Sequence, residues 1–84
     1  MRVTVTLFAR LRELAGRESL AVDVPEGATV ADVWTAVGAA CPGVAPFGAS
    51  VSSAVNAEFA RRHTVVREGD DVAFLPPVSG GAQT

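Results

Sequence analysis

Two consecutive glycines near the C-terminus, Gly80 and Gly81, are the residues of this sequence best suited to deliver chemistry through the main chain. They follow the pair Pro76-Pro77, which lacks backbone N–H groups and stiffens the exit from a predicted strand. Fully extended, residues 78–81 span at most about 14 Å, and glycine enters slots too narrow for a residue with a Cβ atom. The pattern therefore indicates a tip that presents a main-chain carbonyl group to another protein's active site. The alternative is an ordinary frayed terminus.

Side chains that could do chemistry on their own are few. Cys41 lies on the apolar stripe of a predicted helix, which favours packing over a reactive thiol. His63 is the only histidine, and because one histidine cannot form a zinc site alone, we interpret it as a solvated loop residue. Glu68, Asp70 and Asp71 are crowded into a turn, where carboxylates are typically solvated. We therefore predict neither a metal site nor a bound cofactor.

The composition restricts the possible classes of protein. The 84 residues make room for one domain, and a hydrophobic content of 49% excludes a disordered chain. No apolar run approaches the roughly 18 residues of a membrane span. Seven arginines, no lysine and nine acidic residues give a net charge of −2, which argues against nucleic-acid binding. The single cysteine excludes an internal disulfide, and we expect a cytoplasmic protein.

Several short segments have the alternating, β-branched pattern of strands. The predicted strands are residues 2–8, 18–24, 51–55, a short strand within 58–66 that ends at 64–66, and 71–75. Residues 9–15 favour a short helix that ends at Gly16, and residues 43–50 are predicted to form a loop. Phe8 is unusual, because it places a large apolar ring on the polar side of the first strand.

One longer helix is predicted after Thr29, which can cap it together with Asp32, and Pro42-Gly43 ends it. Its apolar stripe consists of Val30, Val33, Trp34, Val37 and Cys41. A sheet with one apolar face and a single helix across it buries both surfaces at once. The sequence therefore predicts an α+β domain over residues 1–77, followed by a flexible tail of residues 78–84.

Residues 8–16 (FARLRELAG) and 71–81 (DVAFLPPVSGG) resemble the small subunits of molybdopterin synthase, a family of ubiquitin-like sulfur carriers. The resemblance runs over residues 2–81, and its specific part is the run Phe-Leu-Pro-Pro-Val-Ser-Gly-Gly. It implies a β-grasp fold, with a mixed sheet of four to five strands and one main helix packed across it.

The resemblance also implies a reaction. The carboxylate of Gly81 is adenylated by an ATP-dependent activating enzyme, and sulfur then replaces AMP to leave a thiocarboxylate. The large subunit of molybdopterin synthase binds the tail, and the thiocarboxylate gives its sulfur to cyclic pyranopterin monophosphate. ATP is used by the activating enzyme, and this chain itself holds no cofactor.

A docking face is implied by the same resemblance. Its expected members are Phe8, Phe59 and Leu75, with Arg12 at the edge and Pro76, Pro77 and Val78 leading to Gly80. From the residues alone, packing of Phe59 in the core is an equally good interpretation.

The sequence departs from the family after Gly81, because Ala82-Gln83-Thr84 follow and convert its carboxyl group into an amide. Removal by a peptidase, a remnant foreign to the natural protein, and a relative that never carries sulfur are the three interpretations. Two further functions stay open: a carrier for thiamine, cysteine or tRNA thiolation, and a ubiquitin-like interaction domain whose tail is blocked.

Overall fold

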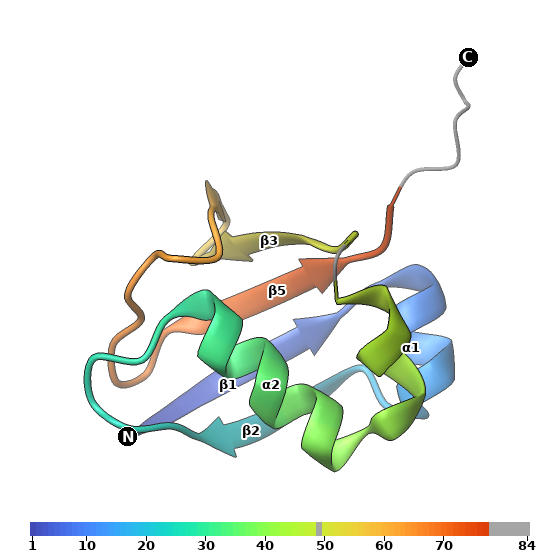
Figure 1. Cartoon of the computed structure of the whole chain (residues 1–84), viewed down its shortest axis with the longest axis horizontal. Helices are drawn as coiled ribbons and strands as arrows, with labels where there is room; N and C mark the ends of the chain where they lie inside the picture. The colour runs from blue at the N-terminus through green and yellow to red at the C-terminus, as the bar shows by residue number, and fades with distance from the viewer. Residues whose placement is uncertain (49, 78–84) are drawn as a thin grey trace.

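Five strands form one mixed sheet in the part of the chain that the computed structural model describes, residues 1–48 and 50–77 (Figure 1). The strands are β1 (Arg2–Leu7), β2 (Ser19–Asp23), β3 (Ser52–Val55), β4 (Glu58–Ala60) and β5 (Asp71–Leu75). The helices are α1 (Ala9–Ala15), α2 (Val30–Ala40) and the 3-10 helix η1 (Pro42–Phe47). The prediction of a flexible tail, which includes Val78, Gly80 and Gly81, lies outside the described residues.

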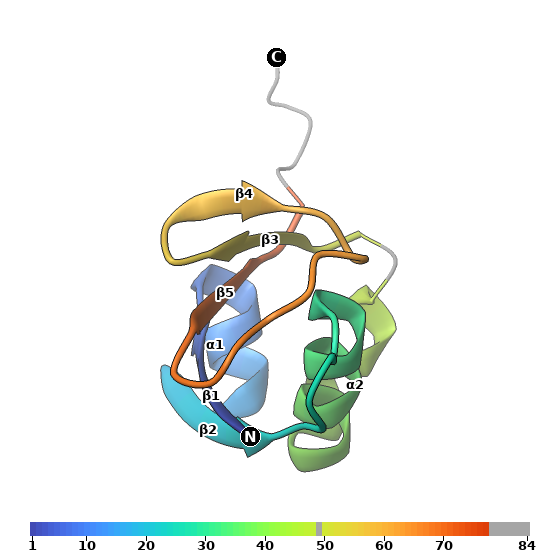
Figure 2. The ribbon, with the colours of Figure 1, turned by 90° about the vertical axis from the view of Figure 1, so that its left-hand side faces the viewer.

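The strand order is β2-β1-β5-β3-β4. The first and last strands, β1 and β5, are parallel neighbours, whereas the other neighbouring pairs are antiparallel. Two neighbouring parallel strands must be linked by a crossover connection. In this chain the connection between β1 and β5 includes α2, which lies on one face of the sheet (Figure 2). The arrangement is a β-grasp fold, and the predicted α+β class with one main helix across a mixed sheet is confirmed.

The core lies between the sheet and α2. In β1, Val3, Val5 and Leu7 are fully buried, because alternate side chains of a strand point to the same face. The predicted stripe of α2 is buried against them, and Cys41 continues it with only 6% of its surface exposed. Trp34 of α2 packs edge-on against Phe74 of β5, with ring centroids 4.9 Å apart and an interplanar angle of 66°. Cys41 is therefore a packing residue, as predicted.

The start of α2 follows the predicted capping pattern. The Thr29 side chain accepts a hydrogen bond from the Asp32 backbone N–H, and the Asp32 carboxylate accepts one from the Thr29 N–H at 2.9 Å. These two bonds satisfy donors that the first helical turn would otherwise leave without partners. The helix ends at Ala40, directly before the predicted stop at Pro42-Gly43.

Three sequence predictions differ from the structure. Residues 42–47 form η1 rather than a loop, because proline is well suited to the first position of a helical turn. The predicted first strand ends at Leu7 rather than at residue 8. The strand predicted to end at 64–66 stops at Ala60. Instead of pairing in the sheet, the segment after Ala60 bends toward α2, and only Val65 forms a bridge, with Thr29.

Candidate docking surface at the end of the last strand

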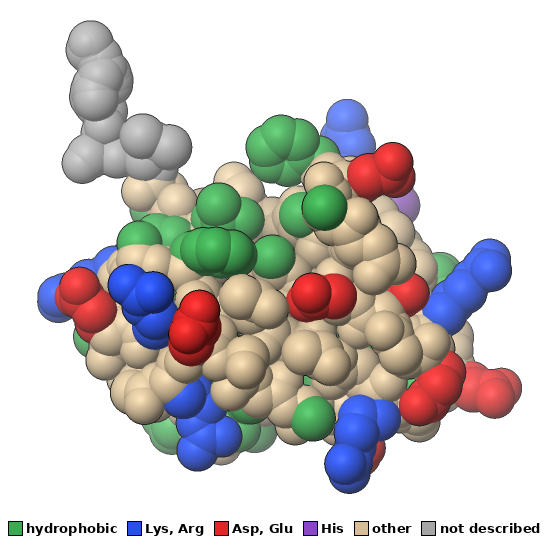
Figure 3. All heavy atoms as spheres, turned by 180° about the vertical axis from the view of Figure 1, so that it is seen from behind, with side chains coloured by type: hydrophobic (Ala, Val, Ile, Leu, Met, Phe, Trp, Pro, Cys, Tyr) green, Lys and Arg blue, Asp and Glu red, His purple; other side chains and the backbone are tan. Residues whose placement is uncertain are grey.

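The face of the sheet turned away from α2 carries apolar side chains where the chain leaves β5. The register places Thr6, Ala73, Ala54 and Phe59 in one row across four strands. Leu75 is two residues beyond Ala73 and shares its side of β5. We call Phe8, Ala54, Phe59, Ala73 and Leu75 the open-face patch. Figure 3 shows hydrophobic side chains gathered on this face of the molecule.

Phe8 joins the patch from the end of β1. Its backbone is extended (φ −115°, ψ 152°), and its N–H donates to the Phe74 carbonyl at 3.2 Å. The alternation of β1 therefore continues through Phe8, so its ring follows Thr6 on the open face. The ring is 43% exposed, as expected for an apolar side chain on the polar side of a strand.

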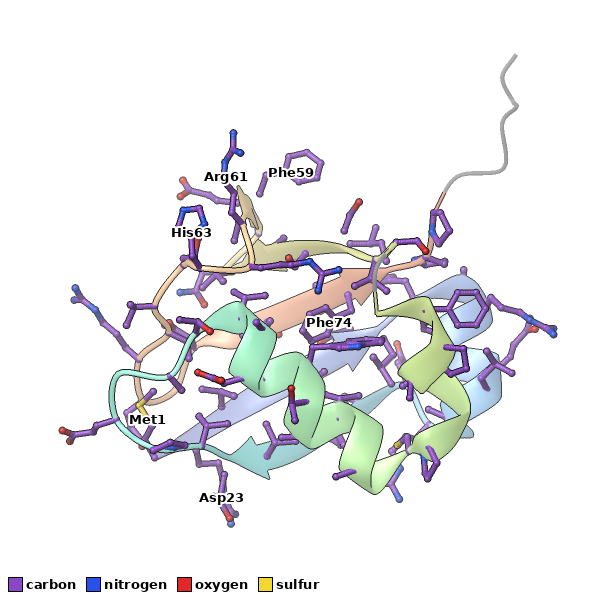
Figure 4. The ribbon with its side chains drawn as sticks, in the orientation of Figure 1. Met1, Asp23, Phe59, Arg61, His63 and Phe74 are labelled. Atoms are coloured by element: carbon purple, nitrogen blue, oxygen red, sulfur yellow. The ribbon has the colours of Figure 1, made fainter. Side chains whose placement is uncertain are left out.

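Phe59 is the most exposed large apolar side chain of the described residues, with 89% of its surface accessible. It lies on β4, and Figure 4 shows its ring projecting away from α2. The interpretation of Phe59 as a core residue is wrong, because its row is Ala54 and Ala73 of the open face rather than buried Phe74. A three-residue strand contains too little alternation for the sequence alone to reveal this.

The exit from the sheet borders the patch. Leu75 and Pro76 are half-buried and Pro77 is exposed. Because both prolines restrict the backbone, the direction in which the chain leaves β5 is coupled to the orientation of the sheet. The structure thus places Phe8, Phe59 and Leu75 on the same open face of the sheet, and Pro76 and Pro77 directly follow Leu75.

Arg12 lies on α1, at the same end of the molecule as the end of β5 (Figure 1). Its side chain is exposed in the last turn of the helix, where a cation interacts favourably with the helix dipole. On the preceding turn, Arg10 forms an exposed ion pair with Glu13 at 3.4 Å. The position of Arg12 is compatible with the predicted edge of a docking face.

The charges at the other end of β1 are tied to each other. Arg2 Nε donates to Asp23 Oδ1 at 3.1 Å across the β1–β2 pair. This hydrogen bond, aided by the opposite charge, lowers the pKa of the Asp23 carboxyl group and raises the pKa of Arg2. Both side chains are exposed, so the pair contributes little to stability.

His63 and the acidic residues before and at the start of β5 do not come together in one site. His63 is exposed, as predicted, whereas Asp70 accepts hydrogen bonds from the Arg67 N–H and the Asn56 amide. Asp71 accepts one from the Thr6 hydroxyl. Within residues 1–48 and 50–77, no three His, Cys, Asp or Glu side chains are grouped so that they could hold a metal ion. The acidic turn is therefore a structural feature that ties β5 to its neighbours.

Sequence reasoning missed two members of the patch and one groove. Ala54 and Ala73 belong to the patch, and the alternation Asp71, Ala73, Leu75 in β5 was the signal that could have found Ala73.

A shallow groove of about 480 Å³ lies at the opposite end of the molecule, between the segment before α2 and the one before β5. It is lined by Met1, Glu26, Gly27, Val65, Val66, Arg67 and Glu68.

Known proteins with similar sequences are small carriers and modifiers. The chain is 32% identical over 81 residues to the molybdopterin synthase sulfur carrier subunit of Arabidopsis thaliana, covering 96% of this chain and 84% of that protein. It is 37% identical over 83 residues to small archaeal modifier protein 1 of Haloferax volcanii, covering 89% of this chain and 95% of that protein. In the described part of the chain, no helix is long and apolar enough to cross a membrane.

Solved structures agree with these relatives. The crystal structure of the same Haloferax volcanii modifier has a TM-score of 0.86 at 34% identity, covering 96% of this chain and 100% of that one. A chain from the Amycolatopsis orientalis BexX/CysO complex has a TM-score of 0.75 at 26% identity, covering 94% and 99%. The model of the ThiS family matches residues 5–81. The fold, the relatives and this match together confirm the predicted resemblance: the chain belongs to the ThiS family of ubiquitin-like sulfur carriers.

Proposed function

We propose that this chain is the sulfur-carrier subunit of a molybdopterin synthase. The observation that carries the proposal is the position of the open-face patch, which borders the exit of a chain that continues to Gly80-Gly81. A partner that covers the patch therefore receives the end of the chain in its own active site. The name of the Arabidopsis thaliana relative supports molybdopterin synthesis as the pathway.

The reactive group in this proposal is the carboxyl group of Gly81. A carboxylate is a poor acyl donor, so an activating enzyme first joins it to the α-phosphate of ATP, and pyrophosphate leaves. Hydrosulfide delivered by a sulfur donor then attacks the acyl carbon and AMP leaves, which produces a thiocarboxylate. Its sulfur is a softer nucleophile than oxygen and attacks cyclic pyranopterin monophosphate in the large subunit, which forms a thioester. Water cleaves this thioester, so the sulfur stays on the pterin and the Gly81 carboxylate is restored.

The domain's contribution is recognition. Phe8, Phe59 and Leu75 supply exposed or half-exposed apolar surface, and burial of such surface drives association. Arg12 adds a charge at the rim, where charges chiefly influence the rate and specificity of association. Pro76 and Pro77 limit the directions in which the tail enters the partner. The large subunit and the activating enzyme are the two partners expected to use this surface, in the cytoplasm.

Removal of Ala82-Gln83-Thr84 by a peptidase belongs to the proposed cycle. In the 84-residue chain the carboxyl group of Gly81 forms an amide with Ala82, and an adenylating enzyme does not activate an amide. Two forms of the chain, one ending at Gly81 and one with all 84 residues, should be incubated with ATP, the activating enzyme and a sulfur donor. Intact-mass spectrometry should show one sulfur-for-oxygen exchange on the shorter form only.

Substitution of Gly81 in the shorter form provides the matched control. Gly81→Val should retain the unfolding curve of the parent but fail to transfer sulfur, because a side chain would enter a slot sized for glycine. If the form ending at Gly81 never acquires sulfur with a competent enzyme and donor, the carrier proposal is wrong.

A second candidate keeps the activation of Gly81 and changes the acceptor. The similarity to small archaeal modifier protein 1 favours a role as a protein modifier, and carriers for thiamine, cysteine or tRNA thiolation use the same activated end. Binding of the synthase large subunit encoded in the same genome distinguishes these functions from the first. An interaction domain with a permanently blocked tail would instead keep all 84 residues in the mature protein from cells.

A further inference from the structure

A group of basic residues directly follows β4, the strand that carries the most exposed residue of the open-face patch. Arg61, Arg62 and His63 lie in the turn after β4, although the whole chain carries a net charge of −2. Figure 4 shows the side chains of Phe59 and Arg61 projecting the same way, away from α2, with His63 beside them in the turn. Glu58, by contrast, is offset by one residue from Phe59 and so points to the other side of β4.

The turn is held firmly in place by its backbone. The Thr64 N–H donates to the Arg61 carbonyl at 3.0 Å, and the Arg61 N–H donates to the Thr64 hydroxyl at 3.1 Å. The carbonyls of Arg62 and Thr64 accept from the Ala31 and Val30 N–H groups of α2 at 3.0 and 2.9 Å. These hydrogen bonds fix the backbone of Arg61 relative to Phe59.

The fold gives Arg62 a hydrogen-bond partner but gives Arg61 none that accounts for its charge. The Arg61 side chain is exposed and projects away from α2 (Figure 4). The first N–H groups of α2 already have acceptors in the turn and in Thr29, which leaves them unable to bind an anion. Arg62 donates to the Gly48 carbonyl, whereas Arg61 has no ion pair within residues 1–48 and 50–77.

The hairpin geometry also exposes the edge next to Arg61. Asn56 and Ala57 have φ values of 51° and 73°, which is the backbone of a two-residue type I′ turn. The flanking pair Val55–Glu58 is then hydrogen-bonded, the next pair Ala54–Phe59 is not, and the Phe59 N–H and carbonyl point away from β3. Since β4 is an edge strand of the sheet, its outward-pointing backbone groups are available to a partner.

We propose that Phe59 and Arg61 form a two-part recognition element and that the partner protein meets it with a carboxylate beside an apolar pocket. The inference rests on the proposed function and specifies the chemistry of the partner surface. The Phe59 ring supplies buried area, and the Arg61 guanidinium selects and accelerates the encounter with an acidic surface. Arg61, which has no ion pair within residues 1–48 and 50–77, thereby gains an oppositely charged partner in the complex.

The test measures binding of the form ending at Gly81 to the molybdopterin synthase large subunit encoded in the same genome. Arg61→Glu should weaken binding about tenfold at about 0.1 M salt and less than about twofold at about 1 M salt, because the Debye length falls from about 10 Å to about 3 Å. Arg67→Glu is the matched control, since it changes the net charge equally but lies in the groove at the other end. It should change the dissociation constant less than about twofold at both salt concentrations.

Three outcomes overturn the recognition element, and a fourth overturns the proposed function on which it rests. Equal effects of Arg61→Glu and Arg67→Glu would assign the change to net charge, and a loss that persists in full at about 1 M salt would assign it to structure. If Phe59→Ala weakens binding but Arg61→Glu does not, only the recognition element is wrong and the carrier function stands. If the unsubstituted chain does not bind the large subunit, the proposed function itself fails. Arg61→Gln, with an unchanged unfolding curve, should show the same loss in a smaller degree.

Discussion

Replacement of Phe59 by alanine should separate the stability of the domain from its binding. In the free chain 89% of the Phe59 surface is already exposed, so Phe59→Ala removes almost no buried area. The free energy of unfolding should change by less than about 0.5 kcal/mol. If the partner buries the ring, the substitution costs the complex about 1.5–3 kcal/mol of binding free energy. The dissociation constant then rises by roughly 10- to 150-fold.

The sequence provides both a probe and a control for this experiment. Trp34 is the only tryptophan and is buried against Phe74, so its fluorescence reports urea unfolding directly. Phe74→Ala makes the same chemical change on the other side of the sheet, where the ring is 1% exposed. This control should cost about 3–5 kcal/mol of stability, because it leaves a cavity beside Trp34. Titration with the large subunit gives the dissociation constant of each folded variant.

Two results would refute the reasoning. A loss of more than about 1 kcal/mol of stability in Phe59→Ala would mean that the ring packs within the domain. An unchanged dissociation constant, measured with a partner that binds the parent chain, would remove Phe59 from the docking surface. The first result concerns the fold and the second concerns the function, so the two errors are distinguishable.

Three further changes test other parts of the structure. Gly48→Ala should destabilise the domain by about 1–3 kcal/mol in urea unfolding, because the new Cβ would lie 2.8 Å from Trp34 Nε1, whereas an unchanged midpoint would contradict this contact. Thr29→Ala should cost about 1 kcal/mol by loss of the α2 cap, and circular dichroism during unfolding measures it. Arg2→Gln should raise the pKa of Asp23 toward its usual value in an NMR titration. A lowered pKa stabilises the fold above the ordinary Asp range, so the variant should lose no more stability than the parent on acidification, and an Asp23 pKa that is unchanged in the variant would contradict the pair.

The elements with a clear period were predictable from the sequence. The alternation in residues 2–7 and the stripe that begins at Val30 are the patterns that a strand and a helix need in order to bury one apolar surface each. The same alternation identified Phe8 as an apolar ring on the wrong side, which proved to be part of the open-face patch. Local patterning was sufficient here because burial and secondary structure favour the same conformation.

The remaining elements depend on contacts that the sequence does not encode locally. Thr64-Val65-Val66 has the composition of a strand, but its backbone groups bond to residues 28–30, at and just before the start of α2, instead of a neighbouring strand. Residues 42–47 contain two prolines and a glycine, which are typical of a loop, yet they form η1. The exposure of Phe59 follows from a register that is set by the turn at Asn56, more than by the three residues of β4 itself.

The two faces of the sheet divide the work of the proposed carrier, and this division has a geometric consequence. The side facing α2 supplies stability, whereas the open-face patch supplies recognition. The reactive end is then placed by the direction that Pro76 and Pro77 allow and by the length of the segment after them. Pro77 borders the patch, and residues 78–81 reach at most about 14 Å when extended. Any partner that covers Phe59 and Leu75 must therefore hold its reacting atoms within about that distance of Pro77. An activating enzyme and a synthase that share no sequence would still have to satisfy this one spacing, which makes the length of the segment after Pro77 a constraint in addition to the glycine required at position 81.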